Sequence, residues 1–301
     1  MSDVGQLTGS VLRAARPNFL TLTPLCVLIG IGAALQIGTH LSVADCVLAL
    51  CGALCAHLSV NLLNEYDDFR SGLDALTVRT PFSGGSGSLP AHPEAAAATR
   101  AAGLFCLGAT GVIGVYFVYQ KGLALLPLGL AGVLLVLAYT PKVTRQPLLC
   151  LLAPGLGFGP LMVVGTAFVL TGRYSWNAVV ASLPPLFLVS GLLLLNQFPD
   201  IDADRQVGRR HLPIVLGRRR SALVFAALVA AAFGTLAAGV LLAVLPRMAL
   251  LGVLMLPLGV VLARQAYLNA EDLPGLVRCM GLNVAMIHAV LLLLAVGLLL
   301  G

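Results

Sequence analysis

Two short acidic segments hold most of the carboxylates of this 301-residue chain. Each segment directly follows a long apolar run, and each places an Asp four residues after an Asn. Seven of the 12 Asp and Glu residues lie in NEYDDFRSGLD at 64–74 and NQFPDIDADRQVGRRHLPIVLG at 196–217: Glu65, Asp67, Asp68, Asp74, Asp200, Asp202 and Asp204. Residues four apart share a helix face. If helices continue into the segments, one stripe is Asn61, Asn64 and Asp68, and the other is Asn196, Asp200 and Asp204.

Oxygen ligands of this kind predict a divalent cation. Unpaired carboxylates at a membrane boundary are unfavourable, and Mg²⁺ is commonly held by one or two carboxylates while substrate phosphates and water complete its octahedron. Basic residues that can grip phosphate oxygens are interleaved with the acids: Arg70, Arg79, Lys142, Arg145, Arg205, Arg209 and Arg210. The pattern therefore predicts a site for a metal-bridged diphosphate.

Two other interpretations of the charged segments remain open. They can be the solvated ends of membrane helices, with Arg as a topology signal, which accounts for Arg218, Arg219 and Arg220 but not for the recurring Asn. They can also form the cation path of a transporter. Transporters place charges at broken helices near the bilayer midplane, whereas these acids gather at one mouth among Arg and Lys, which favours an enzyme.

The composition is that of an integral membrane protein. Hydrophobic residues make up 59% of the chain and charged residues 10%, against about 25% charged in soluble domains. A membrane helix needs about 20 apolar residues, which predicts nine spans centred on 18–38, 42–64, 98–119, 122–140, 149–171, 177–198, 220–244, 248–268 and 280–300. The polar N-terminus lacks the features of a cleavable signal, so we expect the first span to be retained.

Basic residues predict the orientation of these spans. With the N-terminus in the cytoplasm, only Lys121, Arg173 and Arg247 of the 18 Lys and Arg residues fall on the opposite side, as the positive-inside rule requires. The C-terminus then lies on the opposite side. The net charge of +6 follows from this topology and indicates no nucleic-acid partner.

The seven cysteines lie mostly in apolar segments, and we expect them to be free core residues. Cys51, Cys55 and His57 spread over more than one helix face, which argues against a zinc site. We expect His57, Asn283 and His288 to serve helix packing through hydrogen bonds.

The chain resembles the UbiA superfamily of intramembrane aromatic prenyltransferases, and within it is most similar to the MenA-type 1,4-dihydroxy-2-naphthoate polyprenyltransferases. The resemblance covers nearly the whole chain. It rests on Asn64, Asp68, Gly72 and Asp74 in a first motif, on Asn196, Asp200, Asp204, Gly208, Leu212 and Gly217 in a second, on Arg16-Pro17 with Thr23-Pro24, on Tyr139 with Lys142, and on residues 158–172.

This resemblance implies an all-α polytopic fold of nine transmembrane helices around a central cavity with a cytoplasmic cap. Residues 1–301 then form a single transmembrane prenyltransferase domain, with motif loops at 64–90 and 196–217. The implied reaction transfers a polyprenyl group from a prenyl diphosphate to an aromatic acceptor, releasing diphosphate. The acceptor is 1,4-dihydroxy-2-naphthoate or a similar quinone precursor; 4-hydroxybenzoate, homogentisate, a porphyrin or a sugar phosphate remain alternatives. The expected location is a bacterial inner membrane.

Roles for individual residues follow from the two motifs. Mg²⁺ is assigned to Asn64, Asp68, Asp74, Asn196, Asp200 and Asp204, the diphosphate to Arg70, Arg79, Lys142 and Arg205, and catalysis to Asp68, Asp200, Asn64 and Tyr139. Tyr139 can face a developing carbocation with its ring or serve as an interfacial anchor.

The chain also departs from the family pattern. Pro199 stands where an Arg often precedes the second motif's first Asp, and His211 replaces a usual Thr or Ser. The loop at 79–90 is unusually rich in Gly and Ser, and its run at 83–88 can be a lid hinge or a plain flexible loop.

Overall fold

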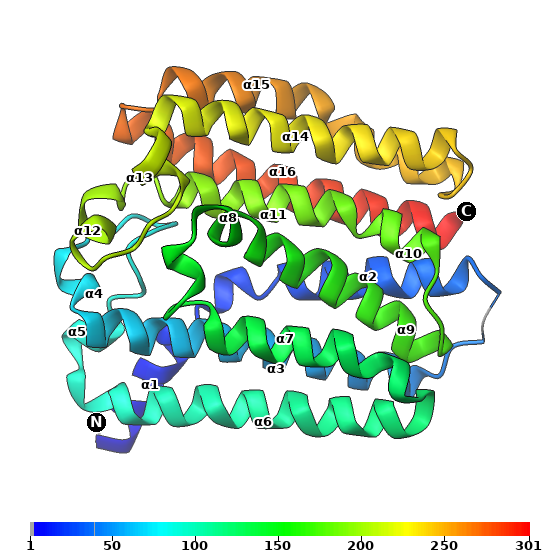
Figure 1. Ribbon diagram of the computed structural model, residues 1–301, viewed down its shortest axis with the longest axis horizontal. Coiled ribbons are helices and arrows are strands. Elements are labelled where there is room, and N and C mark those ends of the chain that lie inside the picture. Colours follow the sequence, from blue (N-terminus) through cyan, green and yellow to red (C-terminus); the bar gives the residue numbers. More distant parts are fainter. Residues whose placement is uncertain (1–2, 39) are drawn as a thin grey trace.

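The computed structural model describes residues 3–38 and 40–301, and the regular structure of this part of the chain is helical. The longer helices run side by side along the bundle (Figure 1). They are α2 (Leu22–Leu35), α3 (Val43–Ser71), α6 (Ala96–Lys121), α7 (Leu126–Ala138), α8 (Pro147–Leu156), α11 (Leu183–Asn196), α14 (Arg218–Leu241), α15 (Leu256–Leu268) and α16 (Leu273–Leu300). Helix α1 (Asp3–Ala14) is inclined to them (Figure 1).

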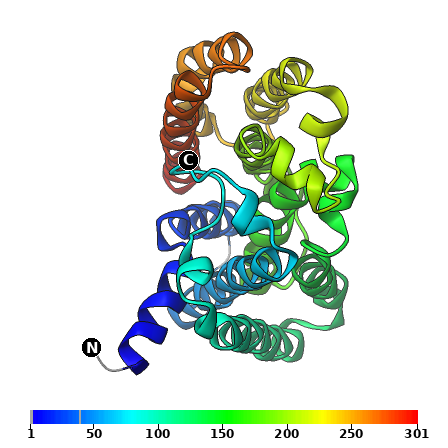
Figure 2. The same ribbon diagram turned by 90° about the vertical axis from the view of Figure 1, so that its left-hand side faces the viewer.

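Short helices gather mainly at one end of this bundle. Figure 1 shows α4 (Leu73–Leu76), α5 (Ser88–Ala91), α12 (Ile201–Gln206) and α13 (Leu212–Leu216) together at that end, and Figure 2 views the bundle from there. Helices α4 and α12 contact each other. The segments that follow α3 and α11, far apart in sequence, therefore meet over the same end of the bundle.

Every predicted span coincides with a helical region, but the count of nine is not confirmed. By length and composition, seven helices of the described residues can cross a membrane, and eight if the bent pair Gly5–Phe19 and Leu22–Leu35 is one span. The helical segment Leu123–Ala138, which matches the predicted span 122–140, is apolar but too short to be counted among them. The chain is thus an all-helical, multi-pass membrane protein.

The two sides of the bundle are packed differently. In the span Trp176–Asn196, which includes α11, 67% of the most apolar window is buried, against 11% in Pro93–Lys121, which includes α6. Helix α11 packs on α14 and α8, and the main core joins α11, α14, α15 and α16. Helix α6 packs mainly on α3. The sparsely packed side, formed by α3, α6 and α7, leaves room for a cavity.

A π-helix, Gly157–Val164, continues α8 and leads into α9 (Gly165–Thr171). Helices with such wide turns are rare in proteins, and those that occur often lie at functional sites. Gly155 and Gly159 face α11 so closely that a Cβ on either would strike the backbone there. This close approach fixes the position of the π-helix, whose Phe158 and Met162 line the cavity.

Candidate active site

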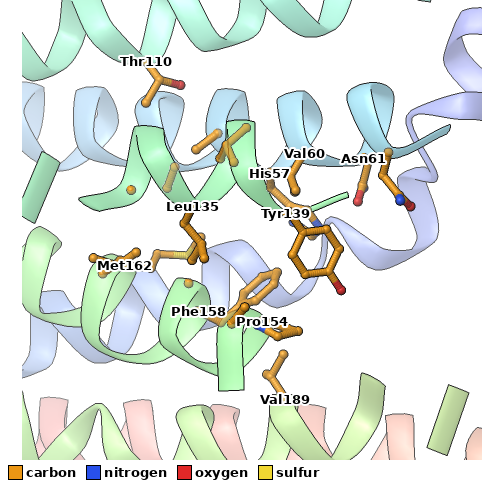
Figure 3. A pocket seen from close by; sticks show the side chains of 18 of the residues that line it. His57, Val60, Asn61, Thr110, Leu135, Tyr139, Pro154, Phe158, Met162 and Val189 are labelled. Carbon is orange, nitrogen blue, oxygen red and sulfur yellow. The ribbon is translucent and has the colours of Figure 1, made fainter. Parts of the chain in front are cut away.

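A cavity of about 610 Å³ lies between α3, α6, α7, the segment from α8 to α9, and α11. Its walls are apolar along most of their length, and polar side chains converge where the two acidic segments meet. Figure 3 shows part of the lining, with His57, Asn61 and Tyr139 in one region and Thr110 at the far side of the view. The cavity thus joins a charged mouth to an apolar interior.

The first acidic segment is presented by a continuous helix. Helix α3 runs unbroken to Ser71, so Asn64 and Asp68 lie one turn apart on one face, and both line the cavity. The Asn64 amide donates to Thr140 Oγ1 at 3.1 Å. Gly72, at φ 77°, ends the helix in the left-handed conformation that glycine adopts without strain. The turn brings Asp74 of α4 back to the cavity wall.

The second acidic segment is not one helix. Helix α11 ends at Asn196, residues 197–200 form a turn, and α12 begins at Ile201. Pro199 lacks a backbone donor and disfavours helical geometry in the residue before it, which explains the break. The conditional expectation of a second helical stripe therefore fails, yet Asn196, Asp200 and Asp204 all line the cavity.

Arg209 joins the two segments. One guanidinium nitrogen donates to Asp68 and the other to Asp204 Oδ1 at 3.1 Å. The second oxygen of Asp204 pairs with His211 Nε2 at 2.8 Å, and His211 is 1% exposed. Because Arg209 and His211 also line the cavity, they hold charge and hydrogen-bonding groups at its mouth.

Arg16 supplies a second cation to the cavity wall. It adopts a left-handed conformation, φ 51° and ψ 61°, which is uncommon outside glycine and often marks a functional position. Its guanidinium pairs with Glu65 Oε2 at 2.8 Å, and Glu65 is fully buried. Glu65 also accepts hydrogen bonds from the backbone and hydroxyl of Ser86. This contact ties α3 to the loop that follows the first motif.

The Gly- and Ser-rich loop packs into the mouth of the cavity. Ser83, Gly84 and Gly85 line it. Ser83 and Gly84 lie close enough to Asp200 to lower its pKa, and Gly85, at φ 73°, lies so close to Asp74 that a side chain there would strike its carboxylate. The loop therefore connects the carboxylates of both motifs.

Two carboxylates outside the spanning helices are difficult to ionise. Burial raises the pKa of Asp74 to about 7, helped by Glu65 and Asp68 and opposed by Arg16 and Arg79. Burial likewise raises the pKa of Asp200 to about 7, helped by Asp204 and opposed by Gly84 and Ser83 of the loop and by Arg209. Each would be stabilised as a carboxylate by a nearby cation.

The oxygen atoms at the mouth fit a Mg²⁺ ion that is only partly coordinated by protein. Buried oxygens of Asp74, Asn196 and Asp200 have no hydrogen-bond partner, although such groups are normally satisfied. Across residues 3–38 and 40–301, no group of three or more His, Cys, Asp or Glu residues could hold a metal by itself. This combination suits Mg²⁺, which commonly completes its shell with phosphate oxygens and water.

The cations assigned to diphosphate from sequence lie outside the cavity wall. Arg70 is exposed beside the Tyr66 ring, Arg79 is exposed near Asp74, and Lys142 is exposed in the turn after α7. Arg205 pairs with Asp202 at the surface. Arg16 and Arg209 occupy the wall instead. The sequence indicated Arg209 only as one of several cations that can grip phosphate, and Arg16 only as part of the resemblance in the first helix. The positive-φ backbone of Arg16 has no signal in the sequence.

The expected roles of the other polar residues are confirmed for some residues and not for others. Tyr139 lines the cavity. His288 hydrogen-bonds Thr21 at 2.8 Å and so links two helices, as expected. The expected interhelical hydrogen bond of Asn283 is not formed, because both its amide nitrogen and its amide oxygen are buried without a partner in the described part of the chain. His57 contacts Thr23 across helices, as expected, but it also lines the cavity. The seven cysteines are free, as expected, but only Cys26, Cys150 and Cys279 are buried, and Cys51 is exposed.

Comparison with known proteins agrees with this architecture. The fold is shared with a digeranylgeranylglyceryl phosphate synthase (14% identity, TM-score 0.68, 98% of this chain and 99% of that one). It is also shared with a UbiA homolog from Aeropyrum pernix K1 (21%, 0.66, 93% and 97%). A third similar structure is a UbiA homolog from Archaeoglobus fulgidus bound to DMAPP and Mg²⁺ (14%, 0.65, 95% and 99%).

These folds define a class of helical membrane proteins, and the sequence places the chain within it. A model of the UbiA prenyltransferase family matches residues 24–287, so the chain belongs to that family. It is 28% identical over 229 residues to the 1,4-dihydroxy-2-naphthoate octaprenyltransferase of Bacillus subtilis (strain 168), covering 75% of this chain and 72% of the relative. The protein is a prenyltransferase, and the family assignment made from the motifs is confirmed.

Proposed function

We propose that the protein transfers a polyprenyl group from a prenyl diphosphate to an aromatic acceptor and releases diphosphate. The proposed acceptor is 1,4-dihydroxy-2-naphthoate or a similar quinone precursor, in line with the Bacillus subtilis relative. The observation that carries the proposal is the charged mouth, where both acidic motifs and two guanidinium groups meet above an apolar cavity. A prenyl diphosphate has the same division into a charged head and an apolar tail.

The diphosphate head is assigned to the mouth. Mg²⁺ would act there as a Lewis acid on the leaving oxygens. Its proposed ligands are Asn64, Asp68, Asp74, Asn196, Asp200 and Asp204, of which Asp74, Asn196 and Asp200 present unpaired oxygens. Arg16 and Arg209 are the cations best placed to neutralise the departing diphosphate, because both line the cavity. Arg70, Arg79, Lys142 and Arg205 stay candidates for attracting the substrate to the mouth.

The apolar part of the cavity is assigned to the prenyl chain and the acceptor. As the allylic C–O bond loosens, positive charge develops on carbon, and the walls exclude the water that would otherwise capture it. The ring of Tyr139 can stabilise that charge by about 0.5–2 kcal/mol. The diphosphate leaves with the electrons of the C–O bond, and the electron-rich aromatic carbon forms the new C–C bond. The C–H bond at that carbon then breaks, its electrons restore the aromatic ring, and the departing diphosphate can accept the proton.

The setting of the reaction follows from the spans. We propose that the protein lies in a bacterial inner membrane with its N-terminus and the charged mouth in the cytoplasm and its C-terminus on the other side. Support comes from Lys121, the last residue of α6, and from Arg173, which follows α9. Helix α6 ends, and α9 lies, at the end of the bundle opposite the short helices α4, α5, α12 and α13 (Figure 1). A prenyl tail dissolved in lipid can then reach the cavity without crossing water.

The proposal is tested by measuring diphosphate release from purified protein in detergent, with Mg²⁺, a prenyl diphosphate and 1,4-dihydroxy-2-naphthoate. We expect release that requires all three components. Because detergent has no compartments, transport cannot produce this signal. Absence of release from folded protein, with any acceptor in a panel of hydroxylated aromatics, would overturn the proposal.

A further inference from the structure

His57 lies on the cavity-facing side of α3, well below the charged mouth. It precedes Asp68 by eleven residues, which places it about 16 Å further along the helix axis. Its ring packs edge-on against Phe158, with centroids 4.8 Å apart, and both residues line the cavity. A polar ring at this depth lies beyond the carboxylates that could hold a diphosphate.

The hydrogen bonds of His57 leave one ring nitrogen unused. Its Nδ1 is 2.8 Å from the hydroxyl of Thr23, a residue with 0% exposure. In the described part of the chain, Nε2 has no hydrogen-bond partner. The contact with Thr23 fixes the ring, because the bonded nitrogen determines how the imidazole is oriented.

Asn61 repeats this arrangement one turn closer to the mouth. Its amide nitrogen donates to Ala15 O at 3.0 Å, while its Oδ1 has no hydrogen-bond partner among the described residues. Asn61 also lines the cavity. The two side chains are separated by four residues, about 6 Å along the axis, which is comparable to the width of an aromatic ring.

Packing alone does not account for two unused polar atoms on an otherwise apolar wall. Buried polar groups are normally hydrogen-bonded, and polar residues within membrane helices commonly mark a substrate path. Here one polar atom of each side chain hydrogen-bonds a neighbouring segment, and the other polar atom has no partner among residues 3–38 and 40–301. Both residues line the cavity. Phe158 adds an aromatic surface beside His57. The set therefore offers two polar contacts and a ring contact to a small aromatic molecule.

We propose that His57 and Asn61, with Phe158 against the ring, form the subsite that recognises the oxygen substituents of a hydroxylated aromatic acceptor. This inference rests on the proposed function and adds to it where the acceptor binds. The acceptor lies on the apolar side of the diphosphate, with its polar groups on α3 and its reacting carbon toward the mouth. A subsite of this kind discriminates strongly, since a buried group that loses its hydrogen-bond partner is unfavourable.

Two substitutions separate recognition from packing. His57→Asn keeps an amide near the position of Nδ1, where it can still bond Thr23, but it cannot reach the position of Nε2. His57→Gln can place an amide near Nε2. We expect His57→Asn to raise the KM for 1,4-dihydroxy-2-naphthoate by about tenfold or more, the effect of losing one hydrogen bond to a buried group. The KM for prenyl diphosphate should stay unchanged, and His57→Gln should restore much of the acceptor KM.

An acceptor with its hydroxyls blocked as methyl ethers provides the second readout. The wild-type protein should discriminate against this analogue, and His57→Asn should discriminate much less, because the contact is already gone. Asn61→Ser gives an independent variant with the same expected loss of discrimination. Thr235→Val is the control: Thr235 lies on α14 outside the cavity wall, and its hydroxyl bonds the helix carbonyl of Ala232, so the acceptor KM should not change.

The outcomes distinguish this inference from the proposed function. Wild-type protein that makes no product with any acceptor overturns the proposed function. Wild-type turnover combined with unchanged acceptor KM and unchanged discrimination in both His57→Asn and Asn61→Ser overturns the acceptor subsite alone. Equal rises in the KM for both substrates would also overturn it, because they indicate a general disturbance of the cavity.

Discussion

The two acidic segments both place oxygen atoms at the cavity, but their backbone conformations differ. The first lies on α3, a continuous helix of 29 residues that fixes Asn64 and Asp68 one turn apart. The second follows the end of α11 at Asn196, passes through a turn containing Pro199, and places Asp204 on the six-residue α12. Both deliver oxygens to one cavity. A continuous helical face and a broken face, interrupted by the turn at 197–200, therefore line the same cavity.

Contacts between the two sides hold the broken face in position. Arg209 reaches from the second segment to Asp68 on α3, and the loop residues Ser83 and Gly84 reach from the first motif to Asp200. Each side is thus positioned by a group from the other. Removing a cavity carboxylate from either segment should therefore stop catalysis. Weakening a contact between the segments should instead reduce mainly the binding of substrate and metal.

The largest effect should come from removing one carboxylate on either face. We expect Asp68→Ala and Asp200→Ala each to lower kcat/KM by at least about 100-fold, since charge stabilisation at the leaving group is lost. The protein should stay folded, as checked by size-exclusion chromatography and thermal unfolding. Asp202→Ala is the control, because Asp202 belongs to the same segment but is exposed. Near-wild-type turnover in either cavity variant would remove that carboxylate from the site.

A smaller effect should follow from altering the connection between the faces. Arg209→Lys keeps the charge but cannot bridge Asp68 and Asp204 through two nitrogens, so we expect kcat/KM for prenyl diphosphate to fall by about 10- to 100-fold. Lys142→Ala should also weaken diphosphate binding, but less, because Lys142 is exposed outside the cavity. A larger loss in Lys142→Ala than in Arg209→Lys would make Lys142 the main cation.

The raised pKa values of Asp74 and Asp200 predict a pH-dependent response to metal. Folded protein without metal binds more protons than unfolded protein between the ordinary and raised pKa values, so its stability should fall as pH rises toward 7. Mg²⁺ requires the ionised carboxylates. The rise in Tm on adding Mg²⁺ should therefore be larger at about pH 8 than at about pH 6. Asp74→Asn should reduce this difference, and a pH-independent rise would contradict it.

The smallest effect should come from the turn itself. Pro199→Ala restores a backbone donor and lets α11 extend toward Asp200, so we expect the Mg²⁺ concentration for half-maximal activity to rise by about a few-fold. Gln206→Ala on α12, an exposed residue, serves as the control. An unchanged Mg²⁺ response in Pro199→Ala would show that the turn does not set the metal geometry.

The sequence predicted the geometry of the first acidic segment better than that of the second. On the continuous α3, helical spacing placed Asn64 and Asp68 correctly on one face. On the second segment the acidic residues were recognised, but Pro199 ended the helix and removed the periodic rule on which the stripe depended. Spacing along a chain predicts geometry only where the backbone is regular.

Contacts between segments that are distant in sequence could not be predicted from helical spacing. Arg16 reaches the cavity through a bend with a left-handed backbone, and Arg209 through a bridge to a helix 141 residues away. Lys142 and Arg205 looked equivalent to them in sequence, yet both are exposed. His57 was expected to serve packing, and the cavity beside it became visible only once α3 and the π-helix were placed together.

The most direct test is a mass-spectrometric product screen of purified protein with Mg²⁺, prenyl diphosphates of several lengths and a panel of aromatic acceptors, beside the Asp68→Ala and Asp200→Ala variants. We predict a Mg²⁺-dependent prenylated product from 1,4-dihydroxy-2-naphthoate that both variants lose. A product from another acceptor alone would keep the site and change the substrate. A product that survives in both variants would contradict the claim that the two faces form one active site.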